Sequence, residues 1–151
     1  MKVLFVCTGN TCRSCMSEAI FNSLKEEDSI TAFSAGVAVS PNSKTSLNSA
    51  LIVKKNLNID ISGRNAVQLT KKLLQENDFI FTMTYSIKEL LINKFPQFKN
   101  KIYSLNEYVG IKGDVSDPYG GTITIYENTF KQLKNSILLL LNKFKEDKGI
   151  L

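Results

Sequence analysis

The chain has 151 residues, 43% of them hydrophobic, and 19 Lys and Arg residues against 14 Asp and Glu residues give it a net charge of +5. This length suits one domain with a sizeable core, so we expect residues 1–151 to form a single domain. No apolar run approaches the ~20 residues of a membrane span, and the N-terminus does not have the shape of a signal peptide, which predicts a cytoplasmic protein without membrane contacts. The lysines are scattered without interleaved aromatic residues, so we expect no nucleic-acid partner.

Apolar periodicity predicts strands and helices that alternate along the chain. Ser14 is expected to cap the first helix, with Glu18 in its first turn to suit the helix dipole. Segment 106–121 contains four glycines and a proline and is predicted to be irregular. The predicted elements are a strand at 2–6, a helix after Ser14, a strand at 30–36, a helix that ends near Asn56, a strand at 78–83, a helix at 86–93, a strand at 101–105 and a helix at 123–145. The inner face of the last helix is predicted to hold Ile125, Thr129, Leu133, Ile137, Leu140, Leu141 and Phe144.

This alternation predicts an α/β fold in which helices cover both faces of a parallel sheet. Ligands of such folds bind at the carboxyl ends of the strands. Cys7 ends the first predicted strand, and segment 106–121 follows the fourth. We therefore expect both to lie at the same edge of the sheet.

All three cysteines, Cys7, Cys12 and Cys15, lie within the first 15 residues, and the chain contains no histidine. A closed zinc site would lack its fourth soft ligand, so we expect neither a metal nor another cofactor. The absence of histidine also excludes every mechanism in which an imidazole activates a cysteine or serine. A nucleophilic cysteine in this chain must be activated in another way.

The stretch CTGNTCRS, residues 7–14, has the spacing of an anion-binding loop that leads into a helix. Gly9 is expected to give the turn its backbone freedom. Arg13, one of only two arginines in the chain, can hold two oxygens of a tetrahedral anion. The cationic surroundings favour the thiolate of Cys7, and Ser14 can donate a hydrogen bond to it. Such a thiolate could attack phosphorus and form a thiophosphate that water hydrolyses, whereas the alternative is a buried structural cysteine.

A leaving group needs a proton, and carboxylic acids in segment 106–121 could supply it. Asp114 and Asp117 are the candidates, and Asp117 lies in the stretch DPYGG, where Tyr119 offers an aromatic wall. The alternative is that this Asp-Pro pair only forms a turn. The pattern favours Asp117 as the acid.

The stretches VLFVCTGNTCRS, SEA, SAG at 34–36 and DPYGG at 117–121 together resemble the low-molecular-weight protein tyrosine phosphatase family over the whole chain. The resemblance implies a four-stranded parallel sheet with helices on both faces, Cys7 as nucleophile, Arg13 as phosphate clamp and Asp117 as general acid. It also implies that Asn10 holds the loop in shape, with Ser34 as its hydrogen-bond partner. The residues expected to bind phosphate or substrate are Thr8, Gly9, Asn10, Thr11, Cys12, Ser14 and Tyr119.

Thr11 distinguishes two branches of that family. Tyrosine-specific members usually carry a bulky apolar residue at this position, whereas the branch that resembles bacterial protein arginine phosphatases carries CTGNTCRS. A threonine hydroxyl can orient a phosphoguanidinium, and Gly120 leaves out the second aromatic wall of many tyrosine-specific members. We therefore expect hydrolysis of phosphoarginine on phosphorylated proteins, with inorganic phosphate as product or inhibitor. The alternative is a phosphotyrosine phosphatase in which Thr11 is a neutral variant.

Two other functions fit the sequence less well. Arsenate reductases resemble this chain in their first loop but need further cysteines after the third strand, where this chain has none. A catalytically silent phosphate-binding module would be expected to lack the nucleophile or the acid, whereas Cys7 and Asp117 are both present.

The sequence leaves the roles of three residues open: Cys15, Arg64 and Cys12. Cys15 stands where the family usually has proline, and Arg64 lies near the position of a family histidine; the sequence does not define a role for either. Cys12 lies five residues from Cys7, which predicts a reversible disulfide between them that protects the nucleophile from over-oxidation. Cys15 could compete for this disulfide, and the alternative is that Cys12 is an inert thiol.

Overall fold

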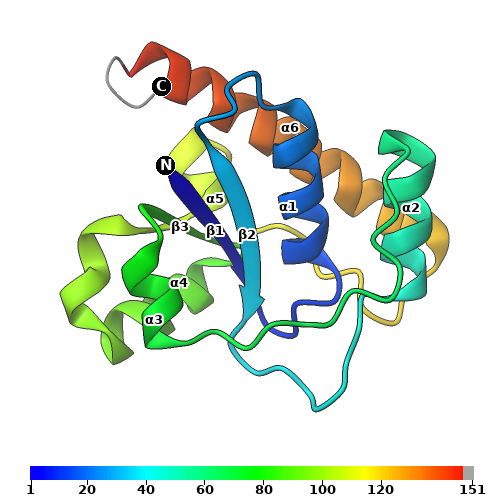
Figure 1. The fold of residues 1–151 in the computed structure, drawn as a ribbon, viewed down its shortest axis with the longest axis horizontal. Helices are drawn as coiled ribbons and strands as arrows, with labels where there is room; N and C mark the ends of the chain where they lie inside the picture. The colour runs from blue at the N-terminus through cyan, green and yellow to red at the C-terminus, as the bar shows by residue number, and fades with distance from the viewer. Residues whose placement is uncertain (148–151) are drawn as a thin grey trace.

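Four parallel strands form the centre of the computed structural model, which describes residues 1–147 (Figure 1). The sheet order is β2-β1-β3-β4, and the register of β1 with the edge strand β2 runs from Lys2 opposite Thr31 to Cys7 opposite Gly36. This confirms the predicted four-stranded parallel sheet. The predicted domain extends to residue 151, and residues 148–151 lie outside the described part. The strands are β1 (Lys2–Cys7), β2 (Thr31–Gly36), β3 (Phe79–Thr82) and β4 (Ile102–Ser104).

Helices cover both faces of the sheet because the strands are apolar on both faces. Val3 and Phe5 of β1 belong to one apolar cluster, and Leu4 and Val6 belong to the other. The first cluster lies under α1, α2, α5 and α6, and the second lies under α3 and α4 (Figure 1). The helices are α1 (Arg13–Leu24), α2 (Leu47–Leu57), α3 (Lys71–Glu76), α4 (Tyr85–Lys94), the 3-10 helix η1 (Pro96–Lys101), α5 (Leu105–Val109) and α6 (Ile123–Glu146).

The helix bounds differ from the predictions in ways that local pattern does not reveal. Helices α3, η1 and α5 are short and were not predicted; α5 lies in the segment predicted to be irregular and ends at Gly110, whose backbone is left-handed. Ser14 is not a cap, because α1 begins at Arg13 after Cys12, and Glu18 lies beyond its first turn. Ile125 of α6 is exposed, whereas Tyr126 and Phe130 are buried.

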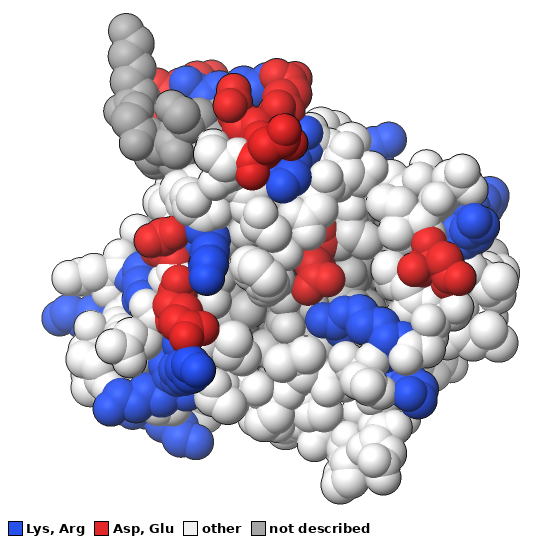
Figure 2. Space-filling view, viewed as in Figure 1, with Lys and Arg blue, Asp and Glu red and all other residues white. Residues whose placement is uncertain are grey.

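Charged side chains are distributed over the surface rather than gathered in one area. On the face in Figure 2, Lys and Arg lie in separate groups, several of them beside Asp or Glu. Ion pairs join some of these charges; the side chains of Lys145 and Glu26, for example, come within 2.7 Å. Among residues 1–147, each helix is either too short or too polar to span a lipid bilayer.

Candidate active site

A cleft of about 460 Å³ opens at the carboxyl edge of the sheet, where β1 ends. One wall is the loop between Cys7 and Arg13, which we call the cysteine loop, and the other is the segment from Asp117 to Gly121, which we call the acid loop. The two predicted segments therefore lie at the same edge. The cleft is lined by Cys7, Thr8, Gly9, Thr11, Cys12, Arg13, Ala38, Ser40, Ser43, Asp117 and Tyr119.

The sulfur of Cys7 lies at the buried end of this cleft and contacts one group of the cysteine loop and one of α1. The backbone N–H of Asn10 donates to it over 3.2 Å, and the Ser14 hydroxyl lies 2.8 Å from it. The side-chain amide of Asn10 donates to the same hydroxyl oxygen over 2.7 Å. Because that bond uses the oxygen as acceptor, the Ser14 hydroxyl is left to donate its proton to the sulfur. Two donors are therefore directed at one sulfur, the arrangement that a sulfur nucleophile needs.

Asn10 is held in the conformation that makes these contacts. Its backbone is left-handed, with φ of 56°, which asparagine tolerates better than most residues. Its side-chain oxygen accepts from the Arg64 guanidinium over 3.0 Å and from the Val67 N–H over 2.9 Å. Both partners can only donate, so they fix the side-chain amide with its NH₂ group toward Ser14. The expectation that Gly9 supplies the special backbone angle is wrong, since Gly9 does not adopt a positive φ.

Arg64 connects the cysteine loop to α1 and β2. Its second terminal nitrogen donates to the Ser34 hydroxyl over 2.8 Å and lies 3.4 Å from a carboxylate oxygen of Glu18. Ser34 in turn donates to Glu18 over 3.0 Å. The predicted direct bond between Ser34 and Asn10 is replaced by this route through the guanidinium, because Arg64 and Val67 already occupy the Asn10 oxygen. The sequence does not define a role for Arg64. The feature that could have pointed to one is that Arg64 is the second of only two arginines in a lysine-rich chain.

The loop also lies directly against the end of β2. A Cβ atom on Gly36 would come within 2.7 Å of the Thr8 carbonyl oxygen, so only glycine fits at this position. The next residues hold the loop from outside, since Val37 N–H donates to the Cys7 carbonyl and Ala38 N–H to the Thr8 carbonyl. With these carbonyls turned outward, the loop can present its N–H groups to an anion in the cleft.

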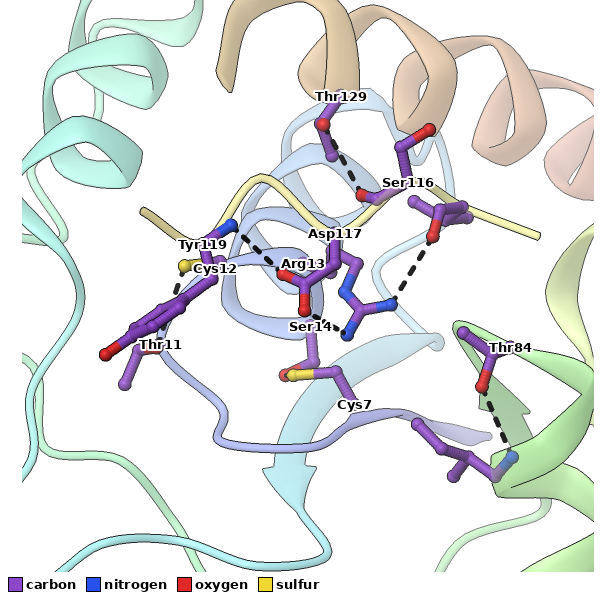
Figure 3. Close-up of polar contacts among 12 residues, drawn as sticks. Cys7, Thr11, Cys12, Arg13, Ser14, Thr84, Ser116, Asp117, Tyr119 and Thr129 are labelled. Atoms are coloured by element: carbon purple, nitrogen blue, oxygen red, sulfur yellow. Dashed lines mark hydrogen bonds and ion pairs between the residues drawn. The ribbon is translucent and has the colours of Figure 1, made fainter. Parts of the chain in front are cut away.

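Arg13 joins the two walls of the cleft. Its buried guanidinium donates to the Val115 carbonyl over 3.4 Å and lies 3.4 Å from a carboxylate oxygen of Asp117 (Figure 3). The Asp117 side chain is 56% exposed, so its carboxylate stands at the solvent side of the cleft while the sulfur stands at the bottom. A tetrahedral anion between them would meet a sulfur nucleophile, a guanidinium and an acid.

The acid loop is fixed to α6 at its base and forms a tight turn at its tip. The Thr129 hydroxyl donates to the Ser116 carbonyl over 3.4 Å (Figure 3). At the tip, Gly121 N–H donates to the Pro118 carbonyl over 2.8 Å, and Gly120 has a φ of 75°. This is the geometry of a turn whose third residue must tolerate a left-handed backbone. The turn leaves the Tyr119 ring exposed at the cleft.

Asp114, the other predicted acid candidate, lies outside the cleft. Its carboxylate accepts from the Tyr85 N–H over 2.8 Å at the start of α4. A carboxylate at a helix N-terminus is stabilised by the helix dipole. Asp114 therefore serves α4, and Asp117 is the carboxyl group that lines the cleft.

The three thiols are free and occupy different surroundings. The Cys12 sulfur lies 3.3 Å from the Tyr126 hydroxyl and 3.6 Å from the Ser46 hydroxyl. Burial, together with the hydrogen bond to Cys12, raises the pKa of Tyr126 to about 12, so this hydroxyl stays protonated at neutral pH. Burial also raises the pKa of the Cys15 thiol, which donates to the Cys12 carbonyl. The predicted disulfide between Cys7 and Cys12 remains a prediction.

Comparison with known proteins places this geometry in a family. Residues 2–149 match the model of the low molecular weight phosphotyrosine protein phosphatases. The chain is 36% identical to a protein-arginine-phosphatase of Bacillus subtilis over 98% of this chain and 99% of that protein. It is 38% identical to a low molecular weight protein-tyrosine-phosphatase, PtpB, of Staphylococcus haemolyticus, over 96% of this chain and 98% of that protein.

Solved structures agree with the sequence comparison. A mutant of the YwlE arginine phosphatase with a phosphorylated active-site serine superposes with a TM-score of 0.91 at 35% identity, covering 100% of both chains. This chain and its relatives are therefore similar over their full lengths both in sequence and in fold. The chain belongs to the low molecular weight phosphotyrosine protein phosphatase family.

Proposed function

We propose that this protein is a protein arginine phosphatase that hydrolyses phosphoarginine side chains through a phosphorylated Cys7. The observation that carries the proposal is the arrangement across one cleft of a doubly hydrogen-bonded sulfur, a buried guanidinium and an exposed carboxyl group. The names of two full-length relatives from Bacillus and Geobacillus, both protein-arginine-phosphatases, support the choice of substrate.

In the first step, the Cys7 thiolate attacks the phosphorus of the bound phosphoarginine. An S–P bond forms as the P–N bond breaks, and the Asp117 carboxyl group gives its proton to the leaving guanidine nitrogen. Arg13 and the N–H groups of the cysteine loop hold the phosphoryl oxygens, whose charge they stabilise. Because Ser14 donates to the sulfur, it stabilises the thiolate before attack and again when the sulfur leaves.

In the second step, water hydrolyses the thiophosphate. The Asp117 carboxylate takes a proton from water as the new O–P bond forms and the S–P bond breaks. Inorganic phosphate leaves, and the thiolate of Cys7 and the proton on Asp117 are restored. Phosphate is therefore expected to inhibit as a product.

Thr11 supports phosphoarginine over phosphotyrosine. It lines the same cleft as Tyr119, and its hydroxyl, which lies 3.6 Å from the Cys12 sulfur, can accept a hydrogen bond from a guanidinium N–H of the substrate (Figure 3). An isoleucine there would remove this hydrogen-bonding group and narrow the cleft. Phosphotyrosine is the second candidate, because Tyr119 offers an exposed aromatic face on which a phenyl ring could stack.

A kinetic comparison tests the choice of substrate. The protein and its Thr11→Ile variant would be given a phosphoarginine peptide and the matching phosphotyrosine peptide. We expect a preference for phosphoarginine that falls by about tenfold or more in Thr11→Ile, the effect of losing one hydrogen bond to a charged group. A preference for phosphotyrosine in the unchanged protein would refute the arginine proposal and keep the phosphatase mechanism.

The proposal includes where and on what the protein acts. We propose phosphorylated proteins as its substrates and the cytoplasm as its location. Three free thiols, of which Cys7 and Cys12 line the cleft, suit a reducing compartment.

A further inference from the structure

Exposed apolar side chains border the cleft on the side of α2. Leu47 and Leu51 stand one turn apart on this helix and are 75% and 51% exposed. Tyr119 of the acid loop is 80% exposed, and Ile125 at the start of α6 is 45% exposed. We call these four residues the rim patch. Exposed apolar residues that adjoin one another mark binding surfaces more often than isolated ones.

Backbone and side-chain contacts join the rim patch to both walls of the cleft. Ser46 N–H donates to the Thr11 carbonyl over 3.0 Å, so α2 begins next to the cysteine loop. The Asn48 side chain donates to the Gly121 carbonyl over 3.4 Å, which ties the same end of α2 to the acid loop. Ile125 packs against Gly121, where a Cβ atom would come within 2.9 Å of its side chain. The start of α2 therefore contacts both walls, and Leu47 stands between the two residues, Ser46 and Asn48, that make these contacts.

A charged pair closes the patch at its far end. Lys55, one turn beyond Leu51, forms an ion pair of 3.2 Å with Glu127 of α6. The patch thus has four apolar residues, a charged pair at one end and the cleft at the other, and binding surfaces for polypeptides likewise combine apolar centres with polar edges.

We propose that the rim patch binds apolar side chains of the substrate protein that flank its phosphorylated residue. This rests on the proposed function, because a phosphorylated side chain in the cleft brings the rest of its polypeptide over the rim. The patch then selects substrates with Leu, Ile or Phe near the phosphorylated residue. It contributes to substrate affinity and leaves the chemical steps unchanged.

Paired peptides test this surface without disturbing the cleft. One phosphoarginine peptide carries leucine on both sides of the phosphorylated residue, and the other carries serine at the same two positions. A pair of phosphotyrosine peptides is built in the same way. The small substrate p-nitrophenyl phosphate has no flanking residues and reports on the cleft alone. The variants are Leu47→Asn and Leu51→Asn. Leu90→Asn is the matched control, because Leu90 is also a helical leucine with 51% exposure but lies on α4, which covers the other face of the sheet.

We expect each rim variant to raise the KM of the leucine peptide about fivefold, the effect of losing part of one buried leucine side chain. The serine peptide, p-nitrophenyl phosphate and Leu90→Asn should show no change. Equal KM values for the two peptides in all variants would overturn the proposal. A dimer in sedimentation that Leu47→Asn dissociates, without any peptide preference, would also overturn it and assign the patch to a second copy of the chain.

Binding of the same peptides to the Cys7→Ser protein separates this proposal from the proposed function. If the protein turns over none of the phosphorylated substrates, the proposed function fails. A tighter affinity for the leucine peptides that Leu47→Asn abolishes would still support the rim patch, and equal affinities would overturn it.

Discussion

The two walls of the cleft are built in opposite ways. Cys7, Asn10 and Arg13 of the cysteine loop are buried, and β2, α1 and Arg64 hold the loop in place through hydrogen bonds and a close approach to Gly36. The acid loop is anchored at Ser116, but its carboxyl group is 56% exposed and touches the other wall through one 3.4 Å ion pair. Because the carboxylate of this pair is more than half exposed, solvent screening weakens its attraction to the buried Arg13 guanidinium. The fold therefore prepares the nucleophile in advance, whereas substrate binding completes the position of the acid.

The largest expected effect follows from removing the nucleophile. Cys7→Ser should lower kcat by on the order of 10⁴-fold or more, because a serine hydroxyl with no general base beside it is a poor nucleophile. Phosphate affinity should persist, since Arg13 and the loop N–H groups remain. Stopped-flow turnover and phosphate inhibition or binding by calorimetry check both statements. Turnover near that of the unchanged protein would refute Cys7 as the nucleophile.

Asp117→Asn removes the acid of the acid loop and should lower kcat by an amount that depends on the leaving group of the substrate. For a phosphorylated peptide, whose leaving group needs a proton, we expect kcat to fall by about 10²- to 10⁴-fold. For p-nitrophenyl phosphate, whose leaving group departs without a proton, the fall should be much smaller. Asp114→Asn is the matched control, because its carboxylate serves α4 outside the cleft. Equal losses on both substrates would argue against an acid role for Asp117.

Arg64 tests whether the cysteine loop depends on its outer support. Arg64→Met removes the donor that orients Asn10, and we expect kcat to fall by about 10- to 100-fold with little change in KM, as for loss of a charge-assisted hydrogen bond. Arg64→Lys keeps a cation beside Glu18 and should recover part of the loss. Lys44→Met is the control, since Lys44 is an exposed cation that donates to Asn65 outside the cleft.

A purely structural role for Arg64 would give a different result. In that case Arg64→Met would lower the melting temperature while its kcat matched that of Lys44→Met. Rapid-quench measurement of thiophosphate formation would locate the loss, because misplaced donors at the sulfur should slow the first step.

Mild oxidation is expected to change the fewest atoms, because it should modify only Cys7 and Cys12 of the three cysteines. Peroxide should oxidise the Cys7 thiolate to a sulfenic acid, which the Cys12 thiol then attacks to form a disulfide with loss of water. Cys15 should stay reduced, because burial raises the pKa of its thiol and keeps it protonated. Mass spectrometry of the protein and of Cys12→Ser checks this. A sulfinic acid at Cys7 with Cys12 still free in the unchanged protein would contradict the prediction.

The sequence predicts best those features whose cause is local. The strand β1 is predicted by its apolar run, and the anion-binding loop is predicted by the spacing from Cys7 to Arg13. The parallel sheet and the cleft at its edge could therefore be anticipated. Helix α3 could not, because it is short and only Leu74 of its residues is buried. Ser14 has the residue type of a cap, but its hydroxyl is engaged by Asn10 and Cys7 instead.

Long-range contacts account for most of what the sequence did not reveal at the site. Arg64 lies 54 residues from Asn10, so no spacing or periodicity links the two. The start of α2 reaches Gly121 from a distance of 73 residues in the chain. Ile125 is the one predicted inner-face residue of α6 that is exposed; the other six are buried, and at the start of the helix the buried residue is Tyr126.

The exposed ring of Tyr119 gives this protein a natural place for an optical probe. The chain contains no tryptophan, so Tyr119→Trp would introduce its sole indole. That indole would sit on the acid loop, beside the cleft and in contact with solvent. Its emission would shift to shorter wavelength when a bound ligand shields the indole from water, so that binding could be followed in real time without a labelled substrate.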